Sequence, residues 1–220
     1  MRTSLEIAGR KIGEDCDPFI IAEVGINHNG ELEKAFQMIE IARDAGADAV
    51  KFQTFKAEEF CGDPSQTYTY TSQGKEVTES MLDMFKRYEF SSDEWKQVKQ
   101  KCDDLGITFM STPQNKSDLD FLMTLGIPAI KVGSDDFANI PHVKSFAETG
   151  LPMIMSTGMA DLAEVYQSLN AVGSLCGYPT VLLLCTSRYP TPPKDVNLKK
   201  LATFRGAFPM LPIGFSDHTQ

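Results

Sequence analysis

Seven short apolar segments recur along the chain, and each of them leads into polar residues. They are rich in β-branched and apolar residues without polar alternation, which is typical of parallel strands buried on both faces. The segments begin at residues 19, 49, 107, 129, 152, 180 and 212 and read FIIAEVG, AVKFQT, ITFMSTP, AIKVGS, PMIMSTG, TVLLLCTS and PIGFSDHT. The pattern therefore predicts seven buried parallel strands.

Amphipathic patterns typical of helices lie between these segments. One apolar stripe runs through residues 31–46, and Ser91 with Glu94 gives the signature of a capping box ahead of a helix that Gly106 closes. Asp161 precedes a third helix. We expect its apolar stripe to contain Leu162, Val165, Tyr166, Leu169 and Val172.

The alternation of strand and helix predicts an α/β protein. Most of the strands start about 20 to 31 residues apart, and seven of them suit a (β/α)₈ TIM barrel better than a doubly wound sheet, which normally needs about five. No eighth strand follows, so residues 19–220 are predicted to form a TIM-barrel catalytic domain truncated after the seventh strand. Residues 1–18 are expected to form a hairpin that seals the barrel bottom, with AGRKIGED as its turn.

One connection is nearly twice the usual length. Roughly residues 56–90 are polar and rich in Tyr, Ser, Thr and Gln, which predicts an elaborated loop after the second strand, with a possible role as a lid.

The composition excludes several kinds of partner. A net charge of -9 and a pI of about 4.9 argue against nucleic acid and anionic membrane, because both require a basic surface. No segment has the length and apolarity of a signal peptide or a membrane span, so we expect a cytoplasmic protein. Five cysteines without a CxxC pair indicate reduced thiols packed as small apolar side chains.

Polar residues follow every predicted strand. Because the C-terminal ends of barrel strands meet on one face, these residues are expected to form one site. In chain order they are Glu23, Lys51 and Gln53, Ser111 and Thr112, Lys131 and Ser134, Ser156 and Thr157, Thr186 and Ser187, and Ser216, Asp217 and His218.

Two of these residues, Lys51 and Lys131, interrupt otherwise apolar strands. An unpartnered ammonium group is costly to bury, so each lysine needs an anionic partner. With nearby hydroxyls they would form a pocket for phosphate and carboxylate oxygens. Those hydroxyls belong to Thr112, Ser134, Ser156 and Ser216. The alternative is that each lysine pairs internally, with Glu23 or Asp136 as the candidate acid.

The histidines and one tyrosine complete the candidate chemistry. His218 could bind a divalent metal with Asp217 as the group that orients it, although a second ligand would be needed; the alternative is a hydrogen-bonded structural histidine. His28 is expected to cap its own turn, and His142 to be solvated. The prolines of RYPTPPKDVNL predict a rigid loop that directs Tyr189 toward the site.

The motifs IAEVGINHNG, AVKFQT, STP, KVGS, STGM, CTSRYPTP and GFSDHT, taken in this order, resemble the sialic acid (N-acetylneuraminate) synthase family with its related nonulosonic acid synthases. These transferases of carbohydrate biosynthesis condense phosphoenolpyruvate with an N-acetylmannosamine-type sugar. The resemblance covers essentially the whole chain. It implies a barrel followed by an antifreeze-like domain, absent here, that reaches the partner's active site in a homodimer.

The resemblance also implies roles for individual residues. Phosphoenolpyruvate would be held by Lys51, Thr112, Lys131, Ser134, Ser156, Ser187 and Ser216. The sugar would contact Gln53, Asp136 and Tyr189, Glu23 and Tyr189 would act in catalysis, and His218 would bind Mn²⁺ or Mg²⁺ with a second protein ligand from outside this chain.

Two departures from the family pattern concern the substrates. Ser187 stands where some bacterial members have asparagine, and GSDD replaces GSGE, so that Asp136 is a shorter acid. The sugar therefore stays open between N-acetylmannosamine and a deoxy-diacetamido sugar. Two other functions also stay open at this stage: a Schiff-base pyruvate aldolase that uses a strand lysine, and a non-catalytic sugar- or phosphate-binding barrel fragment.

Overall fold

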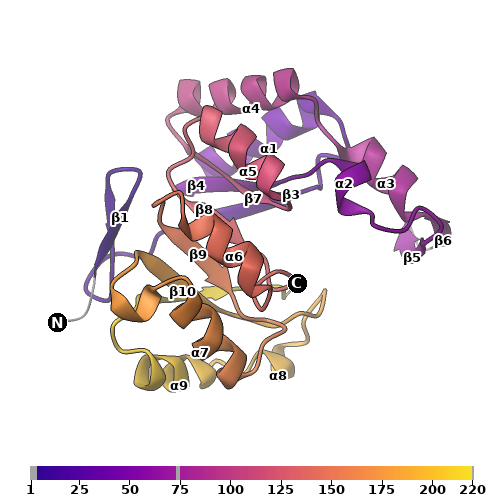
Figure 1. Ribbon diagram of the computed structural model, residues 1–220. Coiled ribbons are helices and arrows are strands. Elements are labelled where there is room, and N and C mark those ends of the chain that lie inside the picture. The colour runs from indigo at the N-terminus through magenta and orange to yellow at the C-terminus, as the bar shows by residue number, and fades with distance from the viewer. Residues whose placement is uncertain (1–3, 73–74, 220) are drawn as a thin grey trace. The chain divides into compact units, whose positions relative to one another are not determined.

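A computed structural model describes residues 4–72 and 75–219 of the chain (Figure 1). Residues 1–3 of the predicted hairpin, residues 73–74 of the predicted long loop and residue 220 lie outside this description. The chain divides into two compact units, which are described separately: Ile20–Gly126, and residues 4–19 together with 127–219.

The unit Ile20–Gly126 contains a three-stranded parallel sheet. Its strands follow one another in chain order: β3 (Ile21–Gly25), β4 (Ala49–Thr54) and β7 (Thr108–Pro113). Its three longer connecting helices are α1 (Leu32–Asp44), α4 (Ser92–Leu105) and α5 (Lys116–Thr124). Helix α1 contacts β3 and β4, whereas α4 and α5 contact β7, so all three helices pack on this sheet.

Helix α4 forms for the reasons read from the sequence. Ser91 accepts a hydrogen bond from the Glu94 backbone N–H, and the Glu94 carboxylate accepts one from the Ser91 N–H, which completes the capping box. Gly106 ends the helix with a left-handed φ of 68°, which glycine adopts without steric cost. The predicted helix is confirmed, with Trp95 and Val98 buried on its packed face.

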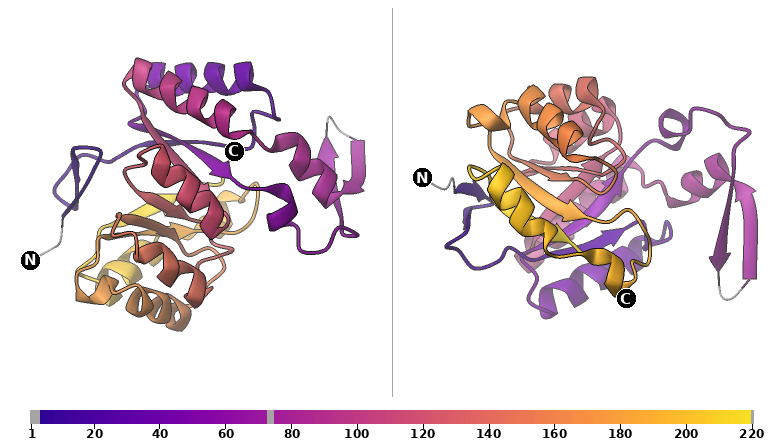
Figure 2. Two further views of the ribbon diagram at one scale, coloured as in Figure 1. Left: turned by 45° about the horizontal axis from the view of Figure 1, so that its top comes forward. Right: turned by 90° about the horizontal axis from the view of Figure 1, so that it is seen from below.

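The long connection after β4 carries structure of its own. Four elements lie in it: α2 (Ala57–Phe60), β5 (Thr67–Ser72), β6 (Lys75–Ser80) and α3 (Met81–Tyr88). Strands β5 and β6 form an antiparallel hairpin, and Figure 2 shows this hairpin extending from the end of α3 that lies away from the parallel sheet. Phe55, Phe60 and Phe85 pack ring against ring at the base of the connection. A lid function stays a prediction.

The other unit contains a four-stranded parallel sheet, again in chain order. Its strands are β8 (Ile130–Val132), β9 (Met153–Ser156), β10 (Thr180–Cys185) and β11 (Ile213–Ser216). Its helices are α6 (Ile140–Ala147), α7 (Leu162–Ala171), the 3₁₀ turn η1 (Ser174–Cys176), α8 (Pro193–Val196) and α9 (Lys200–Ala207). All seven predicted strands are therefore present and parallel, but the prediction that they are all buried was wrong for β11, which has no buried residue, and holds only for Val24 and Gly25 of β3. A doubly wound sheet would reverse its strand order at a switch point, and neither sheet does so.

The N-terminal hairpin has a shorter turn than predicted. Strands β1 (Leu5–Ile7) and β2 (Arg10–Ile12) pair antiparallel, and the turn consists of Ala8 and Gly9, both at positive φ. The prediction of AGRKIGED as the turn was wrong because Arg10–Ile12 is long enough to pair with β1. A cavity of about 150 Å³ is lined by Leu5 of the hairpin and by residues that precede β10 and β11, which places the hairpin at the N-terminal ends of these strands.

The buried face of α7 also differs from the prediction. Val165, Leu169 and Val172 are buried as expected, but the side chains of Leu162 and Tyr166 are 47% and 56% exposed. Ser168 lies on the packed face instead and donates a hydrogen bond to the carbonyl oxygen of Phe137. The packed face of α7 therefore includes Ser168 and leaves Leu162 and Tyr166 outside it.

The cysteines follow the prediction of packed apolar thiols only in part, because Cys176 is exposed and Cys16 is only half-buried. All five cysteines are free thiols, and three of them, Cys61, Cys102 and Cys185, are buried. Burial raises the pKa of the Cys102 thiol to about 12, so this cysteine packs as an apolar side chain.

Among residues 4–72 and 75–219, none of the helices combines the length and apolarity that crossing a bilayer requires.

His28 confirms its predicted structural role. Its side chain is fully buried in the loop after β3, where Nδ1 accepts a hydrogen bond from the Gly30 N–H and the ring stacks on Phe90 at 4.1 Å between centroids. Burial lowers the pKa of His28 to about 4, because an imidazolium ion would lose its hydration among aromatic rings.

This burial predicts an acid-dependent loss of stability. Between about pH 6.5 and pH 4 the unfolded chain takes up a proton at His28 that the folded chain does not bind, so the free energy of unfolding should decrease by ~3 kcal/mol as the pH falls through this range. His28→Phe keeps the ring stack and removes the titrating group. Urea denaturation of both proteins across this range measures the effect.

The difference between the two proteins isolates the contribution of His28. Burial raises the pKa of Asp118 to about 6, and this carboxyl contributes in the opposite direction, but it is present in both proteins and cancels. A difference in unfolding free energy that stays constant between pH 7.5 and pH 4.5 would contradict the account.

Candidate functional site

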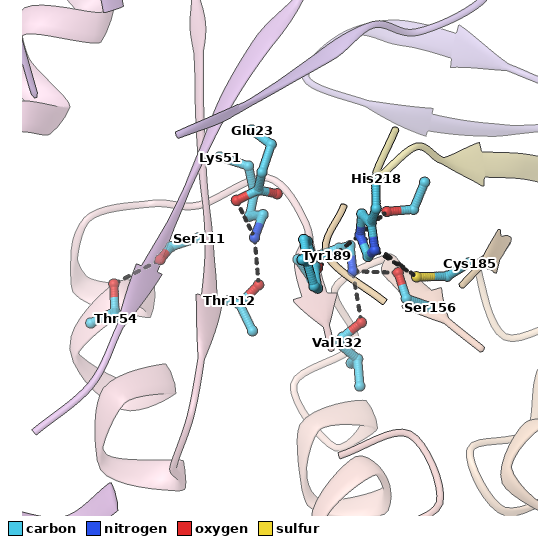
Figure 3. Close-up of polar contacts among 12 residues, drawn as sticks. Glu23, Lys51, Thr54, Ser111, Thr112, Val132, Ser156, Cys185, Tyr189 and His218 are labelled. Atoms are coloured by element: carbon cyan, nitrogen blue, oxygen red, sulfur yellow. Dashed lines mark hydrogen bonds and ion pairs between the residues drawn. The ribbon is translucent and has the colours of Figure 1, made fainter. Parts of the chain in front are cut away.

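In the unit Ile20–Gly126, three predicted site residues meet at the C-terminal ends of β3, β4 and β7. The Lys51 ammonium lies 2.8 Å from Oε1 of Glu23 and donates a hydrogen bond to the Thr112 hydroxyl at 3.3 Å (Figure 3). Lys51 and Thr112 are buried, whereas the Glu23 side chain is 56% exposed. The alternative in which Lys51 pairs with an internal acid is therefore seen here, with Glu23 as that acid.

A bulge at the end of β3 places the Glu23 carboxylate. Glu23 is in register with Lys51, and Gly25 is in register with Phe52, so that Val24 is one residue in excess. Gly25 adopts a positive φ of 55°, and a Cβ atom there would lie 3.2 Å from Oε1 of Glu23. A side chain at position 25 would be strained and would crowd the carboxylate.

The alternation of side chains along the strands separates two roles. Gln53 is in register with Thr112. It follows Lys51 by two residues on β4, so the side chains of Lys51 and Gln53 lie on the same face of the sheet. Ser111 points to the other face, where its hydroxyl hydrogen bonds to Thr54 at 2.7 Å in the core. Ser111 is therefore a packing residue, although it too follows the apolar part of a strand.

In the other unit, Lys131 is the middle residue of the short strand β8. Its ammonium donates hydrogen bonds to the carbonyl oxygen of Val132 at 2.8 Å and to the Ser156 hydroxyl at 2.7 Å, and the side chain is buried (Figure 3). Ser134 follows β8, and its hydroxyl accepts a hydrogen bond from the Gly158 N–H after β9. The unit thus gathers an ammonium group and two hydroxyls at neighbouring strand ends.

Gly158 allows the loops after β8, β9 and β10 to approach one another. A Cβ atom at this position would lie 2.8 Å from Oγ of Ser134, 3.1 Å from Sγ of Cys185 and 3.3 Å from the backbone nitrogen of Ser187. Its φ is not in the left-handed region, so the need for glycine here is a need for space.

We expect Gly158→Ala to push Ser134 and Cys185 apart and to destabilise the protein by about 1–3 kcal/mol, the usual cost of overpacking. Anion affinity should fall with it, because Ser134 is displaced. Urea denaturation and calorimetric titration with phosphoenolpyruvate measure the two effects. Gly206→Ala is the matched control, since nothing lies within 4 Å of its added Cβ in helix α9; equal behaviour of the two variants would contradict the prediction.

His218 lies just after β11 and has a defined tautomer. Nδ1 is 2.7 Å from the carbonyl oxygen of Thr186, which can only accept, so Nδ1 carries the hydrogen and Nε2 carries the lone pair. Around Nε2 lie the hydroxyl of Tyr189 at 2.8 Å, the hydroxyl of Ser216 at 3.4 Å and the thiol of Cys185 at 3.8 Å (Figure 3).

Two details of this cluster were not predicted correctly. The role of Asp217 as the group that orients His218 was wrong, because its carboxylate accepts hydrogen bonds from the N–H and hydroxyl of Thr219. The Thr186 carbonyl orients the ring instead. Cys185 was expected only as a packing residue, and its position directly before Thr186 was the one signal that it would lie beside the site.

Asp136 and His142 lie close together after β8. Oδ2 of Asp136 is 3.8 Å from Nε2 of His142, and burial raises the pKa of the Asp136 carboxyl above its ordinary value. The His142 ring packs on Phe146 with a side-chain exposure of 15%, so the prediction of a solvated histidine was wrong. Ser187 and Tyr189, by contrast, are exposed.

The structure thus describes the predicted site as two sets of residues, one in each unit. Glu23, Lys51 and Thr112 form the first set. The second consists of Lys131 with Ser156, Ser134 with Gly158, and Ser216 and Tyr189 with His218. Within the described ranges no cluster of three or more His, Cys, Asp and Glu side chains is arranged to hold a metal ion, so His218 offers one ligand atom, Nε2.

Two parallel sheets with connecting helices, each sheet carrying a buried lysine that is hydrogen bonded to a hydroxyl, define an α/β protein. The chain belongs to the NeuB family, whose model matches residues 38–220.

Curated relatives and solved structures agree with this assignment. The chain is 40% identical over 94% of its length to the N,N'-diacetyllegionaminic acid synthase of Legionella pneumophila and 35% identical over 99% to the human N-acetylneuraminate-9-phosphate synthase. It covers 59% and 60% of these relatives, about three fifths of their length. The crystal structure of a sialic acid synthetase from Leptospira borgpetersenii in complex with citrate is similar to this chain, with a TM-score of 0.88 and 32% sequence identity. The superposition covers 100% of this chain and 71% of the synthetase chain.

Proposed function

We propose that the protein condenses phosphoenolpyruvate with an N-acetylmannosamine-type sugar to give a nonulosonic acid and phosphate. Family membership supports this reaction class, and the relatives' names point to legionaminic and neuraminic acid products. The observation that carries the proposal is that each unit holds a buried lysine on a parallel strand, hydrogen bonded to a hydroxyl: Lys51 to Thr112 and Lys131 to Ser156.

We further propose that the seven parallel strands belong to one (β/α)₈ barrel and that both lysines serve one anion. The sequential strand order in each sheet supports this arrangement, as does the likeness over the full chain to the Leptospira synthetase. A homodimer and a cytoplasmic location stay predictions.

The two lysines and their hydroxyls would bind the phosphate and carboxylate oxygens of phosphoenolpyruvate. Charge-assisted hydrogen bonds from ammonium groups are roughly twice as strong as neutral ones, and they gain further strength away from water. Thr112 and Ser156 already hold the two ammonium groups in place, which lowers the entropy cost of binding. Ser134, Ser187 and Ser216 would donate further hydrogen bonds.

Glu23 would act on the carbon that becomes positively charged. When the enol carbon of phosphoenolpyruvate attacks the sugar aldehyde, a cation develops at the carbon that bears phosphate. The exposed Glu23 carboxylate would stabilise this cation or direct water to it. Addition of water gives a tetrahedral intermediate, which collapses to the keto acid and phosphate.

His218 would hold a Mn²⁺ or Mg²⁺ ion through Nε2. The residues fit this role for one ligand, since the Thr186 carbonyl fixes the hydrogen on Nδ1 and leaves the lone pair on Nε2. Bound there, the ion would supply Lewis acidity toward the aldehyde oxygen. Asp136, Gln53 and Tyr189 are the proposed sugar contacts.

Phosphate release tests the proposal directly. The full-length protein is mixed with phosphoenolpyruvate, Mn²⁺ and either N-acetylmannosamine or a 2,4-diacetamido deoxy sugar, and free phosphate is measured. We expect release that depends on one of these sugars. Binding without phosphate release for either sugar would favour a binding protein, and a borohydride-trapped pyruvate adduct on Lys51 or Lys131 would favour an aldolase.

A further inference from the structure

Strands β5 and β6 form a sheet of two strands in the long connection after β4. The six residues of each strand pair antiparallel, and within the described ranges no third strand joins either of them. Thr67, Tyr68 and Thr69 are exposed. A two-stranded hairpin is marginally stable in water, and an edge strand presents backbone N–H and C=O groups to a further strand. The hairpin can therefore gain stability from a third strand.

Side chains hold the hairpin to helix α3. The Tyr70 hydroxyl donates a hydrogen bond to the Glu79 carboxylate at 2.8 Å, and the Arg87 guanidinium donates to both oxygens of the same carboxylate at 2.5 and 2.8 Å. The rings of Tyr68 and Tyr70 stack with centroids 5.9 Å apart, which puts both tyrosines on one face of the hairpin. These contacts fix the hairpin through side chains and use no backbone group of β5.

The two edges of the hairpin differ in their protection against pairing. Natural edge strands are protected by charged residues, prolines or bulges. Strand β6 carries Lys75, Glu76 and Glu79, whereas β5 reads TYTYTS, with no charge and no proline, and its register with β6 runs without a bulge. Tyrosine and threonine also favour strands. The edge of β5 is therefore the one suited to accept a further strand.

The sequence of β5 fits a second copy of itself. Residues 67–71 read TYTYT, which is the same in both directions. A twofold axis through an antiparallel pair of strands sets one residue opposite its own copy. With Thr69 at that position, Tyr68 of each copy lies opposite Tyr70 of the other, and the four tyrosines share one face of the sheet. Aromatic cross-strand pairs stabilise a sheet, and no like charges meet.

We propose that β5 is a docking edge for a second copy of this chain. Two β5 strands pair antiparallel about Thr69 and join two hairpins into one four-stranded sheet. The pairing uses residues 67–71 of each copy, far fewer than the ~20–30 residues per side of a stable interface, so by itself it forms a transient dimer. This inference goes beyond the proposed condensation and does not depend on it.

Thiol cross-linking tests the register directly. In an antiparallel pair, the Cα atoms of directly opposite residues lie about 4.5–5.5 Å apart, within the range that a disulfide bridges. We compare wild type, Thr69→Cys and Thr78→Cys under mild oxidation and identify disulfide-linked peptides by mass spectrometry. Thr78 is the matched control, because it is in register with Thr69 on β6 and is also exposed, but two β5 strands would separate it from its copy.

The docking edge predicts that Thr69→Cys forms a disulfide between its two copies at position 69. This bond should form at least ~10-fold faster than the corresponding bond in Thr78→Cys, because paired thiols have an effective concentration near the millimolar range. Equal rates in the two variants, or disulfides that join position 69 only to the native cysteines, would overturn the proposal.

A charge placed on the edge gives a second readout. Thr69→Lys sets lysine opposite lysine across the twofold axis, whereas Thr78→Lys adds the same charge to β6. Sedimentation of the whole chain over a range of concentrations should show association of wild type and Thr78→Lys that Thr69→Lys lacks, with circular dichroism as the check on folding. Association that is absent in wild type, or equal in all three proteins, would contradict the docking edge, while phosphate release judges the condensation separately.

Discussion

Replacement of Lys131 by methionine is expected to abolish phosphoenolpyruvate binding, with an affinity at least ~100-fold lower. The ammonium is buried on β8, where it is held by the Val132 carbonyl and the Ser156 hydroxyl. Loss of one member of a buried, hydrogen-bonded charge pair typically costs 2–5 kcal/mol, much of it from the partner charge left behind. Calorimetric titration with phosphoenolpyruvate measures the loss.

Methionine is close to lysine in size and is apolar, so we expect Lys131→Met to fold. Far-ultraviolet circular dichroism and a urea titration check this point. Lys144→Met, on the exposed surface of α6, removes the same charge from the same unit and should bind phosphoenolpyruvate like wild type. Normal affinity of folded Lys131→Met would refute the role of Lys131.

Glu23→Gln is expected to remove turnover while it leaves phosphoenolpyruvate affinity within about threefold of wild type. The amide keeps the shape of the side chain but cannot balance a developing cation, a role that typically contributes 10²–10⁴-fold to the rate. Affinity should be preserved because the variant takes away the internal partner of Lys51, 2.8 Å distant, and leaves its ammonium for the ligand.

Initial rates of phosphate release and calorimetric titration together separate the two effects in the full-length protein. Glu33→Gln, in the first turn of α1, is the control for loss of a carboxylate and should leave both quantities unchanged. An unchanged rate in Glu23→Gln would count against its place at the reacting centre. A large loss of affinity would instead assign Glu23 to ligand binding.

Much of the fold could be predicted because four of its strands, β4, β7, β8 and β9, are buried on both faces. The segments at 49 and 107 are nearly continuous in apolar residues, and the structure places strands at Ala49–Thr54 and Thr108–Pro113. The ends of α4 could be predicted because they depend on residues close in sequence, the capping box of Ser91 and Glu94 and the C-terminal Gly106. The face of α7 could not be read, because the burial of Ser168 depends on a carbonyl oxygen, that of Phe137, which comes from a distant part of the chain.

The residues of each set could be selected from the sequence, but their contacts could not, and their meeting in one site stays a prediction. The rule that strand ends carry function selected Lys51, Lys131 and His218 from the sequence. Which acid meets Lys51 depends on a one-residue bulge in β3, and the orientation of His218 depends on the backbone carbonyl of Thr186. Backbone carbonyls are present at every position, so the sequence carries no sign of which one will be used.

The central claim is that Lys51 and Lys131 hold a single phosphoenolpyruvate. The most direct test is calorimetric titration of the full-length protein and of Lys51→Met with phosphoenolpyruvate, read for stoichiometry as well as affinity. The account predicts one ligand per chain and at least ~30-fold weaker binding in Lys51→Met, as for loss of a buried charge contact. Two ligands per chain, or wild-type affinity in folded Lys51→Met, would contradict it.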